Sequence, residues 1–256
     1  MSVRVAAILP ARMGSSRFPG KPLLKVHGLP MIEHVRRRTL LCKGFSDVVV
    51  ATCDREIADM IQGFGGRVMM TADTHIAATD RVAEAASKLD CTHVINVQGD
   101  EILVLPEDLE RMIAAIHARP AGPAWNALAA IETADDLAAR SIVKCVVSAS
   151  DRILYCSRDF SKLPIQAPFA PVRVILGILA YEKAFLQNYS RLTRTPGEVA
   201  ESIDQNRMVE HDIALQGVPF TRSYPGINEP REVTLVEEFL KNDKRQTELL
   251  NGLLAR

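Results

Sequence analysis

LPARMGSSRFPGKPL, residues 9–23, is the stretch that decides the fold, because it follows directly on the apolar run 3–9. It holds two glycines, two serines and three cationic side chains, Arg12, Arg17 and Lys21. Glycine lets backbone N–H groups approach phosphate oxygens closely, and Arg and Lys bind them through charge-assisted hydrogen bonds. Pro10 and Pro19 stiffen the loop, which a solvated surface turn does not require. A strand followed by this loop predicts a triphosphate-binding turn at the carboxyl end of a strand in an α/β sheet.

The composition bounds the fold and excludes several partners. The chain has 256 residues, of which 47% are apolar, and this is enough for one substantial core. Lys+Arg and Asp+Glu each total 31, so no global field attracts nucleic acid or an anionic membrane. The sequence shows no signal peptide, no apolar run long enough to span a bilayer and no CxxC pair among its five cysteines. We therefore expect a cytoplasmic protein with reduced thiols, in which any anion site is a local cluster of charges.

Alternating strand and helix patterns in the first half predict an α/β fold with a mostly parallel, Rossmann-like sheet flanked by helices. The expected strands are 3–9, 47–52, 67–70 and 93–97, and the expected helices are 31–42, 54–63, 80–89 and 106–118. Such a sheet binds ligands beyond the carboxyl ends of its strands. The loop after the first strand and the turn 98–101 after the fourth should therefore face one crevice.

The second half has a different pattern. We expect strands over 142–147, 153–156 and 174–181, followed by helices over 185–192, 198–210 and from 232 onward. The whole chain, 1–256, is predicted to be a single domain in which 140–225 forms a small subdomain. A helix over 198–210 would place Glu201, Asp204 and Arg207 near one face, where they serve either a substrate polyol or a surface ion pair.

Asp100 is the candidate metal ligand. It ends the apolar strand 93–97 within the run NVQGDE, residues 96–101. An unpaired carboxylate at the end of a buried strand is costly unless a cation or hydrogen-bond donors neutralise it. Mg²⁺ needs only one or two carboxylates when phosphate oxygens and water complete its coordination. The alternative for Asp100 is an ordinary turn or helix-capping aspartate.

The phosphate loop has neither the GxxxxGK[ST] nor the GxGxxG spacing, which excludes an ordinary P-loop NTPase. Its form, PAR-x-x-S-S-R-x-P-G-K-P-L, resembles the signature of the sugar nucleotidyltransferases, and within them the 3-deoxy-manno-octulosonate (Kdo) cytidylyltransferases. The run NVQGDE resembles the metal-binding turn of the same family. The resemblance implies a fold of the nucleotide-diphospho-sugar transferase type, a homodimer, and transfer of CMP from CTP to a small anionic acceptor with release of pyrophosphate. It also implies that 140–225 binds the acceptor and forms the dimer contact.

The resemblance implies a role for each candidate residue. The catalytic residues would be Arg12, Lys21 and Asp100. The nucleotide contacts would be Pro10, Ala11, Arg12, Gly14, Ser15, Ser16, Arg17, Lys21, Thr79 and Gln98. The acceptor contacts would be Arg81, Gln98, Arg158, Tyr181, Glu201 and Asp204. Mg²⁺ would be held by Asp100 and Asn228. For Arg81 and Arg158 the alternative is a surface charge without a ligand.

The chain departs from the family pattern at several positions. Ala77 and Ala78 stand where the family has Ser and Gly, Ile175 where it has His, and Asn228 where it has Asp. These departures leave open a different anionic acceptor, such as amino-Kdo, another nonulosonic acid or a phosphonate. They also leave open a catalytically weakened regulator that binds the nucleotide, or a structural domain whose cationic loop contacts a protein partner.

Overall fold

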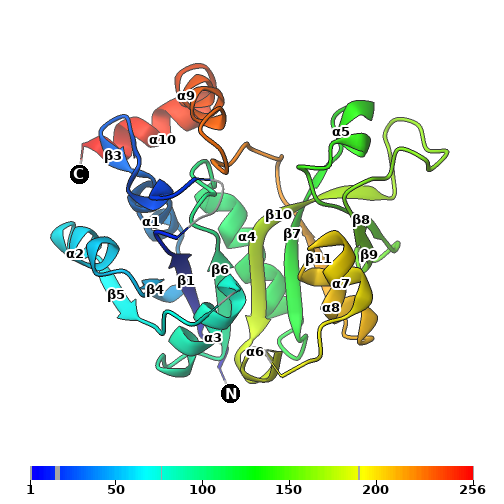
Figure 1. The fold of residues 1–256 in the computed structure, drawn as a ribbon, viewed down its shortest axis with the longest axis horizontal. Coiled ribbons are helices and arrows are strands. Elements are labelled where there is room, and N and C mark those ends of the chain that lie inside the picture. Colours follow the sequence, from blue (N-terminus) through cyan, green and yellow to red (C-terminus); the bar gives the residue numbers. More distant parts are fainter. Residues whose placement is uncertain (1, 15–17, 76, 190, 256) are drawn as a thin grey trace.

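β1 (Val5–Ala11) lies at the centre of the molecule in a computed structural model of the chain, which describes residues 2–14, 18–75, 77–189 and 191–255. Every residue of β1 is buried, because parallel strands flank it on both sides and helices cover both faces of the sheet (Figure 1). In spatial order the main sheet runs β11 (Leu215–Pro219), β7 (Ala124–Ala130), β10 (Val172–Glu182), β6 (His93–Val97), β1, β4 (Phe45–Thr52) and β5 (Arg67–Met70).

The strands β6, β1, β4 and β5 are parallel to one another, as the alternating pattern predicted. The strand β10 is antiparallel to both of its neighbours, β6 and β7, and β11 is parallel to β7. The predicted α/β class with a mainly parallel sheet is therefore confirmed. β8 (Lys144–Val147) and β9 (Ile153–Ser157) form an antiparallel hairpin that extends the sheet through β10.

Alternate residues of β1 point into two separate cores, as the two-residue repeat of a strand requires. Ala7 and Leu9 belong to the core beneath α1 (Met31–Leu41), α2 (Arg55–Gly63) and α4 (Pro106–Ala118). Ala6 and Ile8 belong to the core beneath α3 (Ala78–Ser87), α6 (Lys183–Tyr189) and α8 (Gln205–Glu210). Both layers hold β1 rigidly, so the loop that follows it starts from a fixed point.

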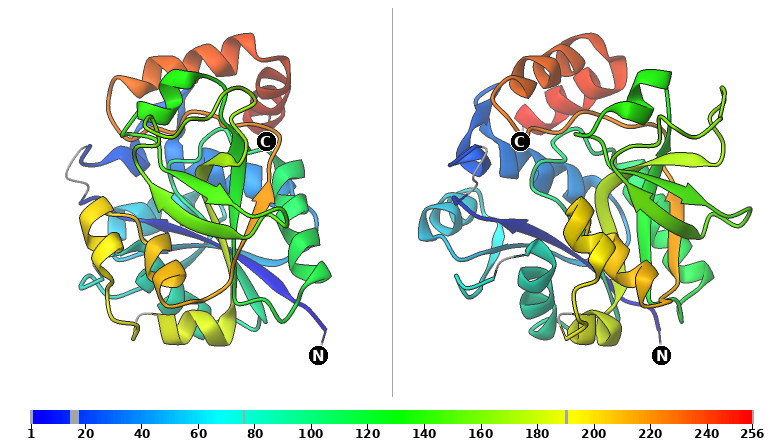
Figure 2. Two further views of the ribbon diagram at one scale, coloured as in Figure 1. Left: turned by 90° about the vertical axis from the view of Figure 1, so that its right-hand side faces the viewer. Right: turned by 45° about the vertical axis from the view of Figure 1, so that its right-hand side comes forward.

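A third core holds the C-terminal helices against the start of the chain. α9 (Glu232–Asn242) and α10 (Lys244–Leu254) lie over α1 at one end of the molecule (Figures 1 and 2). Val236, Leu240 and Leu250 pack there with Ile102, Leu103 and Ile227. The segment 226–228 is thereby placed beside the turn that contains Asp100. The remaining elements are short: η1 (Lys21–Leu23), β2 (Lys25–Val26), β3 (Leu29–Pro30), α5 (Ala134–Ala138) and α7 (Pro196–Glu201).

Several predicted boundaries need correction. The first strand starts and ends two residues later than expected, because Pro10 and Ala11 pair with β4 and belong to the strand rather than to the loop. The predicted helix 198–210 is two helices, α7 and α8, since Ser202 adopts a left-handed conformation with φ 54° and ends the first. The predicted last helix likewise breaks at Asp243. The strands β7 and β11 were missed.

Residues 140–225 contribute to two parts of the fold. They form the β8–β9 hairpin with α7 and α8 beside it, and they also supply β10 and β11 to the central sheet. Across the described ranges of the chain, no helix combines the length and the apolar content needed to cross a membrane.

Candidate active site

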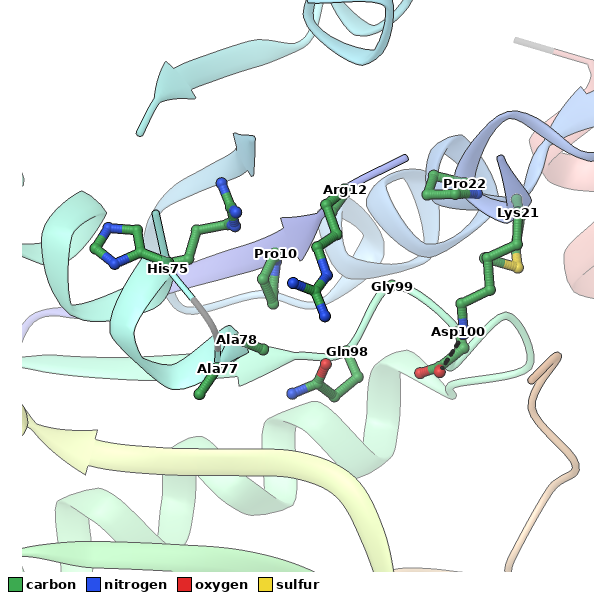
Figure 3. A pocket seen from close by; sticks show the side chains of 13 residues that line it. Pro10, Arg12, Lys21, Pro22, His75, Ala77, Ala78, Gln98, Gly99 and Asp100 are labelled. Atoms are coloured by element: carbon green, nitrogen blue, oxygen red, sulfur yellow. Dashed lines mark hydrogen bonds and ion pairs between the residues drawn. The ribbon is translucent and has the colours of Figure 1, made fainter. Parts of the chain in front are cut away.

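The loop after β1 and the turn after β6 line one cavity, as the sequence predicted. Figure 3 shows the lining: Pro10, Ala11, Arg12, Lys21, Pro22, Met31, His75, Ala77, Ala78, Arg81, Gln98, Gly99 and Asp100. Gly99 makes this convergence possible, because a Cβ there would lie 3.1 Å from the Pro10 carbonyl oxygen and 3.2 Å from Ile32 Cδ1. A side chain at this position would press on both neighbours, so the close approach of the two turns favours glycine.

Lys21 and Asp100 are in contact at one end of this cavity. The Lys21 ammonium donates to Asp100 Oδ2 at 2.8 Å (Figure 3). It also donates to the Ile227 carbonyl oxygen at 3.1 Å. Lys21 opens η1, and the loop before it is closed by a hydrogen bond from Gly20 N to Met13 O at 3.0 Å. Gly20 has φ 74°, a conformation that glycine adopts without strain. The cation is therefore fixed at the site by the fold of the loop.

Arg12 brings a second cation to the same space. It is exposed at the end of β1, and among the described residues its guanidinium has no hydrogen-bond or ion-pair partner. The next residue is anchored, because Met13 N donates to Asp54 Oδ2 at 2.8 Å. A solvated, unpaired cation on an anchored backbone is available for an anion. Gly14 is exposed and outside the cavity lining, and the predicted contacts Ser15, Ser16 and Arg17 lie outside the described residues.

Glu101, which the sequence analysis did not select, belongs to the same turn. Some of its atoms reach solvent, but its carboxyl group is buried and Oε1 accepts from Gly177 N at 2.8 Å. Burial and the neighbouring Asp100 carboxylate raise the pKa of Glu101 to about 7, although the Gly177 N–H and Lys21 oppose the shift. The run NVQGDE carried the signal for this residue, since it contains two adjacent acids.

Asn228, the second predicted metal ligand, lies in the segment that touches the Asp100 turn. Ile227 N donates to Asp100 O at 3.4 Å, and a Cβ on Gly226 would lie 2.9 Å from the same oxygen. Asn228 does not line the cavity, and its backbone N–H donates to Glu232 Oε2 at 2.5 Å. The described residues contain no group of three or more His, Cys, Asp or Glu side chains that would hold a metal by themselves.

Arg81 is a buried cavity residue rather than a surface charge. Its Nη1 donates to Thr71 Oγ1 at 2.5 Å and to Ala72 O at 3.5 Å, and only 2% of the residue is exposed. Beside it, His75 Nε2 lies 2.7 Å from Glu84 Oε2. These contacts hold one end of the cavity, with Lys21 and Asp100 at the other (Figure 3).

A second cavity adjoins the first and shares Gln98 with it. Its lining contains the predicted contacts Thr79, Arg158 and Asp204 and, in addition, Val143, Ile175, Leu176, Gly177, Leu179, Ser202, Ile203 and Gln205. The Arg158 guanidinium donates to three carbonyl oxygens, those of Glu201 at 2.8 Å, Arg140 at 3.0 Å and Ser202 at 3.3 Å. Burial and the nearby Glu198 carboxylate raise the pKa of Asp204. Polar and apolar residues thus contribute equally to the wall of this cavity.

The other predicted acceptor contacts support this cavity without lining it. Glu201 accepts from Ser157 Oγ and Arg158 N, both at 3.1 Å. Tyr181 is buried, and its hydroxyl forms a hydrogen bond with the Thr79 side chain. The expected shared face of Glu201, Asp204 and Arg207 is wrong, because the helix breaks at Ser202 and Arg207 instead pairs with Glu198 at 2.5 Å.

A cation-lined cavity beyond the carboxyl ends of parallel strands, with a second cavity beside it, offers adjacent places for the two substrates of a nucleotidyltransferase. The fold is shared with 4-diphosphocytidyl-2C-methyl-D-erythritol synthase from Anaerococcus prevotii, which superposes with a TM-score of 0.63 at 13% identity, covering 94% of this chain and 99% of that one. The structure titled CMP:2-keto-3-deoxy-manno-octonic acid synthetase complexed with CTP superposes with a TM-score of 0.88 at 37% identity, covering 94% of this chain and 99% of that one.

Sequence comparison gives the particular family. The chain matches the family model described as cytidylyltransferase over residues 6–215. It is 38% identical to the 3-deoxy-manno-octulosonate cytidylyltransferase of Escherichia coli, over 89% of this chain and 92% of that protein. It is 34% identical to the 8-amino-3,8-dideoxy-manno-octulosonate cytidylyltransferase of Shewanella halifaxensis, over 94% of this chain and all of that protein. The chain belongs to the cytidylyltransferase family.

Proposed function

We propose that this protein transfers CMP from CTP to the anomeric hydroxyl of a 3-deoxy-octulosonic acid of the Kdo type and releases pyrophosphate. The observation that carries the proposal is the pair of adjoining cavities that share Gln98, one with Arg12, Lys21 and Asp100 and the other with Arg158 and Asp204. The relatives named above act, by their names, on Kdo and on its 8-amino analogue. Their similarity over most of the chain supports an acceptor of this class.

The nucleotide would occupy the cavity beside β1. Arg12 and Lys21 are the cations that would neutralise the triphosphate, and backbone groups at Pro10 and Ala11 would meet the nucleoside at the end of the strand. Ala77 and Ala78 close the opposite side, where Thr79 begins the shared wall with the second cavity. The triphosphate is thereby expected at the Lys21 end and the base at the Arg81 end.

The donor atoms around Lys21 fit Mg²⁺. The Asp100 carboxylate, the Ile227 carbonyl and the side-chain amide of Asn228, the next residue, can each supply an oxygen ligand, which a hard divalent cation prefers. The Lys21 ammonium already bridges two of these oxygens, so the site attracts positive charge. When bound together with the triphosphate, Mg²⁺ would supply electrostatic stabilisation of the charge that develops on the phosphate oxygens. Asp100 would hold it, with Asn228 as the second ligand.

The acceptor would enter the second cavity. Gln98 can hydrogen-bond an acid that lies across the boundary between the two cavities, while Arg158 offers positive charge to its carboxylate. Asp204 and Gln205 face the same space and can meet hydroxyl groups. The acceptor hydroxyl would then attack the α-phosphate in line with the departing pyrophosphate. This chemistry requires positioning and charge neutralisation, and no nucleophile from the protein.

The experiment is a pyrophosphate-release assay with CTP, Mg²⁺ and a panel of acids that includes Kdo and 8-amino-3,8-dideoxy-octulosonate. We expect release that depends on both CTP and one of these acids. The same assay with ATP, UTP and dTTP measures the strictness for CTP. Binding of CTP without release on any acid would instead favour the nucleotide-binding regulator and would contradict the proposed transfer.

We also propose that the protein acts as a homodimer in the cytoplasm, where CTP is available. Leu154, Tyr155 and Leu163 are exposed apolar side chains on β9 and the loop after it, with 42%, 46% and 42% of each residue accessible. Within the described part of the chain β9 pairs with β8 and with no other strand, so a second copy can cover this surface. Light scattering should give twice the mass of the chain, and Tyr155→Asp should reduce it. A monomer at micromolar concentration would contradict this proposal.

A further inference from the structure

Glu101 lies next to the proposed metal ligand, yet its carboxylate is directed at the backbone of β10. Its Oε1 accepts from Gly177 N at 2.8 Å. The turn that carries it is closed by a hydrogen bond from Glu101 N to Gln98 O at 3.1 Å. Glu101 therefore ties the turn 98–101 to a strand that forms the wall of the second cavity.

Gly177 makes a reciprocal pair of bonds with this turn. Its N–H binds Glu101, and its carbonyl oxygen accepts from Gln98 N at 3.0 Å. A Cβ at this position would lie 2.5 Å from Glu101 Oε1 and 3.2 Å from both Gln98 Cβ and Gln98 Cγ. Only glycine leaves room for the carboxylate and for the Gln98 side chain together. The position of Gln98 between the two cavities thus depends on both Gly177 and Glu101.

The register of β10 explains why a backbone N–H is free to bind Glu101. The ladder between β10 and β6 ends at Ile178 and Val97, so Gly177 meets the turn after β6 instead of a strand. On the other edge of β10, the pairing with β7 is irregular between Ile175 and Leu179. The Asn126 side chain fills the gap, since its Nδ2 donates to Leu176 O at 2.9 Å and its Oδ1 accepts from Gln205 Nε2 at 2.9 Å. Gln205 and Gly177 both line the second cavity. A continuous set of hydrogen bonds therefore joins Glu101 to the acceptor side.

We infer that Glu101 is a positioning residue that acts through Gly177 to set Gln98 against the bound acceptor. The inference rests on the proposed transfer reaction. It gives Glu101 a positioning role, which differs from the metal binding proposed for its neighbour Asp100. Its carboxylate holds β10 at the distance where an acid in the second cavity meets the α-phosphate in the first. A misplacement of about 1 Å at such a point can cost about 100-fold in rate.

The test compares Glu101→Ala, Glu101→Gln and wild type in the pyrophosphate-release assay. For each protein we would measure kcat, the KM values for CTP and for the acid, and the Mg²⁺ concentration that gives the half-maximal rate. Glu101→Ala should lower kcat by about tenfold or more, because the turn and the wall lose one of the two hydrogen bonds that join them. The KM for CTP and the Mg²⁺ requirement should change by less than about threefold, since Arg12, Lys21 and Asp100 remain. Glu101→Gln should restore most of kcat, because an amide oxygen also accepts from Gly177 N.

Two further variants complete the design. Gly177→Ala should reproduce the loss of kcat in the wild-type background but add little to Glu101→Ala, because the two residues act through one contact. Glu110→Ala, a change to an α4 glutamate that lines neither cavity, should match wild type.

The inference is overturned if Glu101→Gln is as slow as Glu101→Ala, if the Mg²⁺ requirement rises sharply in both, or if the effects of Glu101→Ala and Gly177→Ala add. Wild type without turnover on any acid would contradict the proposed function instead.

Discussion

Lys21 and Asp100 lie 79 residues apart in the sequence and form an ion pair of 2.8 Å at the centre of the candidate site. The side chains are 17% and 25% exposed, so each charge has lost part of its hydration and benefits from the other. The pair joins the phosphate loop to the proposed metal turn. It also places a cation where the triphosphate is expected.

Lys21→Ala should therefore reduce catalysis far more than folding. We expect kcat for pyrophosphate release to fall by about 100-fold, the size of effect seen when one charge-stabilising donor is removed. The thermal midpoint should change little, because the pair is partly solvated. The matched control is Lys25→Ala, which removes an exposed lysine from β2. Equal pyrophosphate release by Lys21→Ala and wild type would exclude the assigned role.

The strength of metal binding should respond to the charge at position 228. Asn228 lies in the segment that hydrogen-bonds the Asp100 turn, and its amide brings an oxygen without formal charge. Asn228→Asp should lower the Mg²⁺ concentration for half-maximal rate by about tenfold, since ligand charge tunes the affinity for hard cations. Asp100→Asn should raise it. Rates measured against free Mg²⁺ after removal of metal with EDTA test both, and an unchanged requirement in Asn228→Asp would place this residue outside the metal site.

The sequence contained enough local information to predict the nucleotide side. The loop 9–23 and the turn 98–101 each carry their own signal, and the parallel sheet brings the carboxyl ends of β1 and β6 together. The strands β7 and β11 have no such signal. Ala124–Ala130 is rich in alanine, a helix former, and Leu215–Pro219 contains Gly and Pro. Their strand conformation is imposed by pairing with each other and with β10.

The acceptor side depends on contacts between distant parts of the chain, which local patterns do not encode. Residues 198–210 have a helical pattern, but Asn206 binds the backbone N and O of Cys156 in β9 at 3.2 and 3.1 Å, and the chain turns at Ser202 to reach this position. Glu101 was missed for a related reason. The direction of its carboxylate is decided by the N–H of Gly177 in β10, 76 residues further along the chain, where the pairing of β10 with β6 has ended.

Arg158 gives a prediction that separates acceptor binding from nucleotide binding. Its guanidinium holds the carbonyl oxygens of Glu201 and Ser202, so it fixes the break between α7 and α8 that forms part of the cavity wall. Arg158→Ala should raise the KM for the acid by about tenfold and leave the KM for CTP nearly unchanged. Arg158→Lys should recover little, because one ammonium cannot reproduce the planar fork. Arg152→Ala, a change to an exposed arginine, is the control. A parallel rise in both KM values would contradict the division of the site into two cavities.

The hydrogen bonds of Glu84 predict how the stability of the folded protein depends on pH. A backbone hydrogen bond from Ala72, with those from His75 and Lys88, lowers the pKa of Glu84 from 4.5 to about 2, despite opposition from burial. A carboxylate with a lowered pKa stabilises the folded state above its unfolded pKa, and this stabilisation is lost as the pH falls towards the folded value. Wild type should therefore have a higher thermal midpoint than Glu84→Gln at pH 7, and the difference should shrink as the pH falls from 4.5 towards 2. Glu56→Gln, at an exposed position in α2, should show no such pH-dependent difference. The difference in thermal midpoint between wild type and Glu84→Gln could instead stay constant down to the lowest pH at which the protein is folded. That result would show that the contacts with Ala72, His75 and Lys88 do not hold the carboxylate in its charged form.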